Sequence, residues 1–152
     1  MKHFLILIFF SLITSIKVMS QFNFTFPEKW TKDFKVEVTD NGGMLDHELS
    51  IRITYDSVIY TNRVQSKKEK NSFTLNEKQR TEIFAQLKKL KSDPIGSVVV
   101  TLDKGTSTIE LHNSNGIFAA SDDTDNEEIR RDFHEVFNYL VNFAKPIGRK
   151  KQ

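Results

Sequence analysis

Three histidines are the side chains of this sequence best suited to metal or acid-base chemistry. His47 lies in a predicted loop, His112 in a predicted strand and His134 in a predicted helix. A three-histidine zinc site or a hydrolytic centre would require these separate elements to converge on one pocket. Asp46 and Glu48 flank His47 and could serve acid-base chemistry, but the same residues are typical of a solvated loop. A hydrolase with a dispersed histidine and carboxylate site is therefore the alternative function.

Two local patterns resemble metal sites, and both lack required ligands. A zinc-protease helix needs two histidines one turn apart, and Asn138 stands where the partner of His134 would be. A calcium loop aligned from Asp123 would have Glu128 at the required glycine and His134 at the closing glutamate. Acidic residues at a helix N-terminus are instead explained by the helix dipole. We therefore predict no metal and no cofactor.

Other common reaction centres have no counterpart in the sequence. The chain of 152 residues contains no cysteine, which excludes disulfides, thiol nucleophiles and thiolate metal sites. Its six glycines form neither a dinucleotide-binding run nor a phosphate loop, and no nucleophile elbow is present. The sequence therefore predicts a protein that is not an enzyme.

The N-terminus has the layout of a secretory signal peptide. A short positive start is followed by thirteen mostly apolar residues, 4–16, and by Val18-Met19-Ser20 before Gln21. A membrane-spanning helix needs about 20 apolar residues, so this run is short for one, although an uncleaved anchor is the alternative. We expect cleavage after Ser20, a secreted or periplasmic product and no stable membrane insertion after cleavage.

The charge of the expected product disfavours nucleic-acid binding. Lys2 and Lys17 account for the net charge of +2, so residues 21–152 have equal numbers of basic and acidic groups. A neutral product lacks the excess positive charge that attracts nucleic acid. Basic residues do cluster around 63–70 and in the tail, but such short runs usually serve solubility.

Period-two alternation predicts several strands separated by turn residues. We expect strands near 34–38, 49–55, 58–64, 98–102, 106–112 and 117–120, with an exposed loop at 65–72. Phe22, Phe24 and Phe26 fit either a short strand or a flexible lead-in that packs on the domain.

Two segments have helical periodicity. Thr74 and Glu77 have capping-box spacing before one apolar stripe, and Thr124 and Glu127 before the other. The first helix must end before Pro94. We predict an α+β domain with a mostly antiparallel sheet of about five or six strands and two amphipathic helices packed on one face. The expected divisions are a signal peptide (1–20), a lead-in (21–33), one domain (34–145) and a basic tail (146–152).

The segment Asp40-Asn41-Gly42-Gly43-Met44 leads from the first predicted strand into a Gly-Gly turn. With the strand, helix, hairpin and helix that follow, residues 34–144 resemble the emfourin-type inhibitors of metalloproteases and a broader set of small exported bacterial proteins. The chain departs from those inhibitors in its export signal and its basic 65–72 segment. The resemblance implies a fold and an inhibitory role, and no functional residue is transferred.

We predict a non-catalytic protein-binding or inhibitory module that uses the loop at 41–48, because exposed loops on a rigid sheet commonly bind partners. The predicted binding residues are Asn41, Gly42, Gly43, Met44, Asp46 and His47. The expected partner is a protein of the extracytoplasmic space, and an exposed edge strand would permit a dimer.

Overall fold

The structure is a computed structural model that describes residues 24–42, 46–91 and 105–146. They form, in chain order, β1 (Lys35–Asn41), β2 (His47–Ile53), β3 (Ser57–Val64), β4 (Lys67–Thr74), α2 (Glu77–Leu87), β5 (Thr106–Asn113), β6 (Gly116–Ser121) and α3 (Glu127–Ala144). The six strands make one sheet in the order β4-β3-β2-β1-β5-β6, and every neighbouring pair is antiparallel. The predicted α+β class, with a mainly antiparallel sheet, is confirmed.

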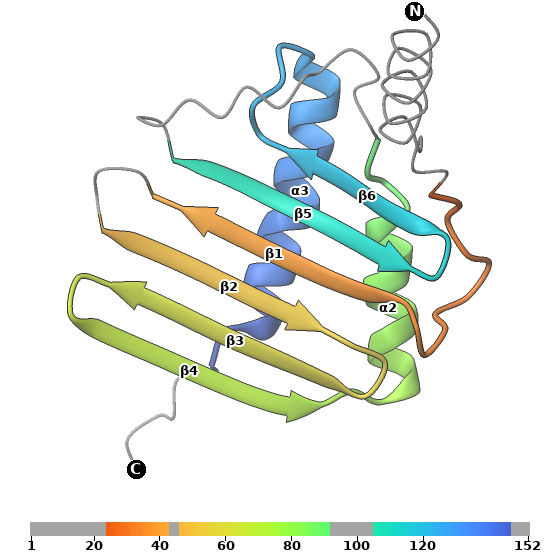
Figure 1. Cartoon of the computed structure of the whole chain (residues 1–152), viewed down its shortest axis with the longest axis horizontal. Coiled ribbons are helices and arrows are strands. Elements are labelled where there is room, and N and C mark those ends of the chain that lie inside the picture. Colours follow the sequence, from red (N-terminus) through yellow and green to blue (C-terminus); the bar gives the residue numbers. More distant parts are fainter. Residues whose placement is uncertain (1–23, 43–45, 92–104, 147–152) are drawn as a thin grey trace, which may run out of the picture.

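The alternation of the strands places their apolar residues together. Val36 of β1 lies opposite Ile53 of β2 and Leu111 of β5. Val38 likewise lies opposite Ile51 of β2 and Ile109 of β5. These side chains are buried together with Ile83 and Leu87 of α2 and with Phe133, Val136 and Leu140 of α3. Figure 1 shows both helices behind the sheet. Most alternate strand positions are polar, although Ile59 and Ile117 are exposed. On this face the hydroxyl oxygens of Thr39 and Thr108, in neighbouring strands, lie 2.6 Å apart.

Both helices begin two residues later than their sequence patterns predict. Asn76 is the N-cap of α2: its side chain accepts from the Gln79 backbone N–H, and the Gln79 side chain accepts from that of Asn76. Asn126 caps α3 by accepting from two backbone N–H groups of the first turn. Asparagine competes well with threonine as a cap, so the actual caps lie inside the predicted motifs. The helix α2 ends at Leu87, before Pro94 as expected.

The prediction of a loop at 65–72 is wrong, because β4 occupies Lys67–Thr74 and pairs with β3 along its whole length. Most of its residues are exposed, and Phe73 is its one apolar side chain packed against the core. An edge strand of this kind has backbone pairing without apolar alternation, and its lysines discourage pairing with another chain. The sheet has six strands because β4, which was not predicted, is one of them. The strand predicted at 98–102 lies outside the described residues.

The described part of the lead-in, residues 24–33, forms no strand, so the strand interpretation of Phe24 and Phe26 is wrong and the lead-in interpretation holds. Their rings pack beside the core: Phe26 lies 5.8 Å from Phe34 and 5.1 Å from Phe84, measured between ring centroids. The signal segment and most of the tail lie outside the described residues. Within the described ranges, no helix has the length and apolar character needed to cross a membrane.

Candidate functional site

The described residues of the predicted binding loop lie at one end of the sheet. Asn41 ends β1, Gly42 follows it, and Asp46 and His47 lead into β2. Figure 1 shows the end of β1 and the start of β2 beside the β3–β4 connection and the start of β5. We call this region the hairpin end and define it as residues 41–42, 46–48, 63–67 and 105–106. Gly43 and Met44 belong to the predicted site but lie outside the described residues.

Two backbone positions at the hairpin end are conformationally unusual. Asp46 has φ 45° and Gln65 has φ 55°, and they are the two non-glycine residues with positive φ in the described ranges. The left-handed region costs a residue with a Cβ about 1–2 kcal/mol. The Gln65 N–H donates to the Asp46 carbonyl at 2.9 Å, which joins the two turns. Such outliers persist where the surrounding structure holds them, and they are frequent at functional sites.

The side chains around these turns are charged and accessible. The Arg63 guanidinium lies 3.2 Å from the Glu48 carboxylate and 3.6 Å from that of Asp46. All three side chains are about half exposed, and an exposed pair contributes only about 0–1 kcal/mol to stability. Val64, beside Arg63, is also 46% exposed. The hairpin end therefore offers an arginine, two acids and an aliphatic side chain that the fold uses little for its own stability.

His47 connects strands instead of projecting into solvent as a loop residue would. Its Nε2 lies 2.9 Å from Asn62 Oδ1 on β3, and its Nδ1 lies 3.6 Å from Asp40 Oδ2 on β1. Since an amide oxygen only accepts, Nε2 is the donor in this assignment. The imidazole thus links three strands at the base of the predicted loop, which is a positioning role.

Two glycines allow the backbone of the hairpin end to pack closely. A Cβ on Gly105 would lie 2.6 Å from the Asn41 carbonyl oxygen, and one on Gly42 would lie 2.7 Å from the His47 Cβ. The Gly42 N–H also donates to the His47 carbonyl at 2.9 Å. The sequence places Gly105 in a turn far along the chain and gives no local signal that it packs against Asn41.

The three histidines do not form a common pocket. Along β1, Asn41 lies opposite Thr106 and Lys35 opposite His112, so His112 is six residues from the hairpin end, or about 20 Å. His47 is at the hairpin end, and His134 lines a hollow of about 260 Å³ that reaches Gly105 of the same end, so His112 is the histidine that lies apart. The convergence that the hydrolase alternative requires is therefore absent from the described residues.

One group of potential metal ligands lies on the polar face of the sheet. Ligand atoms of Glu37, Glu110 and His112 lie within 4.8 Å of one another. Each carboxylate already has a partner, because Arg52 Nε donates to Glu37 at 3.0 Å and His112 Nε2 lies 3.0 Å from Glu110. These contacts account for the cluster without a metal ion.

Two members of the acidic run before α3, Asp122 and Glu128, have protein partners. Asp122 Oδ1 accepts from the Ser107 backbone N–H at 3.0 Å, and Arg130 lines the same hollow as Asp122 and Asp123. The Lys91 amine pairs with Glu128 at 2.6 Å and with Asp132 at 3.3 Å. The hydrogen bond from the Lys91 amine lowers the pKa of the Glu128 carboxyl group.

No protein-family model matches this chain, and no curated protein matches it.

Proposed function

We propose that this chain is an exported, non-catalytic binding module and that its hairpin end contacts a protein partner. The observation that carries the proposal is the pairing of Asp46 and Gln65, two strained residues whose turns are joined by a backbone hydrogen bond beneath exposed charged side chains. Backbone strain of this kind is retained where the surrounding structure holds it, and it is frequent at binding and catalytic sites. Export rests on the leader-like residues 1–20.

The scaffold behind the hairpin end is suited to binding with little reorganisation. Val38 and Ile51 are fully buried on the central strands, and Leu49, two residues after His47 in β2, is 4% exposed. We take both helices to cover this apolar face, as the burial of the α2 and α3 stripes supports. A surface held in its binding geometry loses less conformational entropy when a partner docks, which favours affinity.

The chemistry of the hairpin end favours a protein partner. Arginine is enriched among residues that dominate protein interfaces, and Arg63 here lies between two exposed carboxylates beside exposed Val64. A partner would cover a mixed surface with opposite charges and a small apolar contact. The resemblance to emfourin-type inhibitors makes secreted metalloproteases the first class of partner to test.

The proposal is tested by immobilising residues 21–152 and capturing proteins from the extracytoplasmic fraction of the native host. Arg63→Ala should weaken capture of the specific partner about tenfold or more, since it removes a central charged contact. Asp56→Ala is the matched control, because Asp56 is an exposed acid in the turn at the opposite end of β2.

A metalloprotease among the captured proteins would be assayed for inhibition by the wild-type chain and both variants. Equal capture by the wild type, Arg63→Ala and Asp56→Ala would contradict the assignment of the hairpin end as the contact surface.

A further inference from the structure

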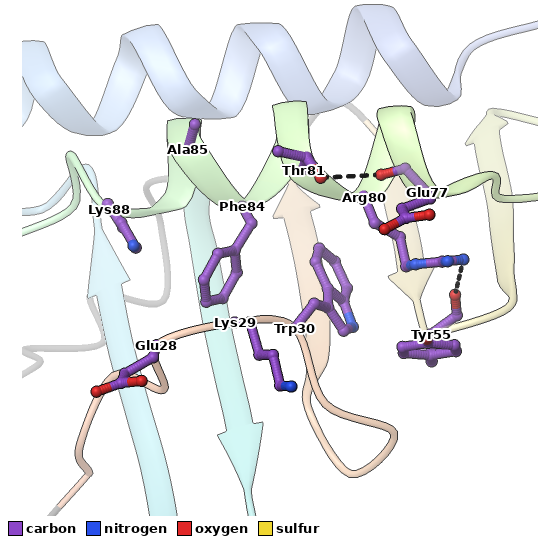
Figure 2. Close-up of a pocket in the computed structure, with 10 residues that line it drawn as sticks. All are labelled: Glu28, Lys29, Trp30, Tyr55, Glu77, Arg80, Thr81, Phe84, Ala85 and Lys88. Atoms are coloured by element: carbon purple, nitrogen blue, oxygen red, sulfur yellow. Dashed lines mark hydrogen bonds between the residues drawn. The ribbon is translucent and has the colours of Figure 1, made fainter.

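A second surface feature lies at the other end of the molecule, where the lead-in crosses α2. It is a cavity of about 490 Å³, within the range of small-molecule sites. Figure 2 shows its lining, which comes from the lead-in, the turn after β2 and the outer side of α2. It belongs to neither the predicted loop nor the hairpin end.

Two aromatic rings make the floor of this cavity. Trp30 and Phe84 are each 7% exposed, and their ring centroids lie 6.1 Å apart. Figure 2 shows both rings projecting into the same space between α2 and the lead-in. The Trp30 Nε1–H donates to the Phe34 carbonyl at 3.1 Å, which fixes the orientation of the indole. The floor is therefore a rigid apolar surface suited to a flat ligand body.

Arg80 provides a positioned cation at the wall of the cavity. Its Nη1 donates to the carbonyls of Tyr55 at 3.2 Å and Leu75 at 3.1 Å, and its Cζ lies 4.2 Å from the centroid of the Tyr55 ring. Figure 2 shows the guanidinium over the Tyr55 ring, with the Trp30 ring to one side. These contacts use Nη1 and one face of the guanidinium. Among the described residues, Nε and Nη2 have no hydrogen-bond partner, so both can donate to a carboxylate, whose geometry matches the guanidinium.

Among the described residues, the other cations of the cavity have no ion-pair partner, and the Lys88 amine lies 5.0 Å from the centroid of the Phe84 ring. Within the described ranges, arginine ion pairs involve Arg52, Arg63 and Arg131, and lysine ion pairs involve Lys78, Lys89 and Lys91. None of these residues lines the cavity, whereas Lys29, Arg80 and Lys88 do. The lining also contains two acids, Glu28 and Glu77, so one positive charge is in excess.

We propose that this cavity binds an organic carboxylate with a flat apolar body. The body lies on Trp30 and Phe84, and the carboxylate accepts from Arg80, with Lys88 adding attraction at the rim. The same chemistry is presented by a free aromatic acid and by the C-terminus of a peptide that ends in an aromatic residue. The inference is independent of the proposed protein contact, since the hairpin end contributes no residue to it.

Trp30 makes the proposal directly measurable, because it is the single tryptophan of the chain. Its fluorescence would be followed during titration of residues 21–152 with 3-phenylpropanoate and with acetyl-alanyl-phenylalanine. The corresponding amides, which lack the negative charge, are the ligand controls. We expect saturable changes for the acids and affinities about tenfold or more weaker for the amides, as loss of a charge-assisted hydrogen bond implies. The tighter of the two acids identifies the source of the carboxylate.

Matched variants separate this site from general electrostatic attraction. Lys88→Gln should weaken acid binding several-fold, whereas Lys89→Gln should not, because the Lys89 amine pairs with Glu135 and does not line the cavity. Arg80→Gln should weaken it about tenfold or more. A thermal melt of Arg80→Gln checks folding, and the two lysine variants test the site if that variant unfolds. Equal responses to acid and amide, equal effects of the two lysine variants, or no saturable response would overturn the proposal.

Discussion

The two ends of the sheet are built in different ways. The hairpin end is shaped by backbone contacts and exposed charges, with Gly105 against Asn41 and Arg63 between two carboxylates. The opposite end, which we call the aromatic end, is formed by Phe26, Trp30, Phe34 and Phe84, whose contacting ring centroids lie between 5.1 and 6.1 Å apart. The difference predicts that removal of a buried ring at the aromatic end costs more stability than a change of an exposed side chain at the hairpin end.

The largest effect is expected at the centre of the aromatic end. Phe34 is fully buried and its ring contacts those of Phe26, Trp30 and Phe84. Phe34→Ala should lower the free energy of unfolding by about 3–5 kcal/mol, because it removes apolar contacts and leaves a cavity. Urea unfolding measures the loss, and Phe34→Leu is the conservative control with a smaller one. A loss below about 1 kcal/mol would contradict this contrast between the two ends.

At the hairpin end, backbone changes should matter more than side-chain changes. Gly105→Ala introduces a Cβ 2.6 Å from the Asn41 carbonyl oxygen, so the strands must separate. We expect a loss of about 1–3 kcal/mol, similar to overpacking in a core. Ser66→Ala, at an exposed turn position nearby, should stay within about 0.5 kcal/mol of the wild type. Equal unfolding midpoints for the two variants would show that this close approach is not needed.

A pH-dependent contribution is expected beside the aromatic end. The Ser114 backbone N–H donates to the Asp33 carboxylate at 3.0 Å, and this bond is the main cause that lowers the pKa of Asp33 from 3.8 to about 2. The folded-state pKa lies below the unfolded value, so the stabilisation is complete above about pH 4 and is lost as the pH falls towards 2.

The measurement for this prediction compares the melting temperatures of the wild type and Asp33→Asn between pH 6 and pH 2. The difference between them should shrink as the pH falls through the range from 4 to 2. A difference that is constant across this range would show that the Asp33 carboxylate is not responsible.

The smallest expected effect is a gain at the hairpin end. Gln65 is exposed with φ 55°, and glycine removes the left-handed cost of about 1–2 kcal/mol while adding an entropic cost of about 0.5–1 kcal/mol. Gln65→Gly should therefore raise the free energy of unfolding by about 0.5–1 kcal/mol. Gln65→Ala keeps the Cβ and should not produce this gain. A destabilised glycine variant in urea unfolding would contradict the assignment of strain to this turn.

Local patterns predicted most of the fold, and long-range contacts explain what they missed. Val36 and Val38 of β1 alternate with polar residues, and the stripe through Phe133, Val136 and Leu140 has helical spacing, so these elements were evident. The strand β4 was predicted as a loop, because an edge strand is held by backbone bonds that need no apolar alternation.

The site was less accessible to prediction than the fold. The position of the hairpin end followed from Asn41 and Gly42, but the His47 contacts with Asp40 and Asn62 join three strands and have no local signal. The cavity at the aromatic end requires Trp30 of the lead-in to meet Phe84 of α2, 54 positions later in the sequence. Such contacts depend on the packing of distant segments.

The most direct test of the account is amide hydrogen exchange of residues 21–152, alone and saturated with the captured protein partner. We expect the partner to slow exchange at residues 46–48 and 63–67, and to leave residues 26–34 and 77–88 unchanged. Protection confined to the aromatic end or to the helices would contradict the assignment of the hairpin end as the binding surface.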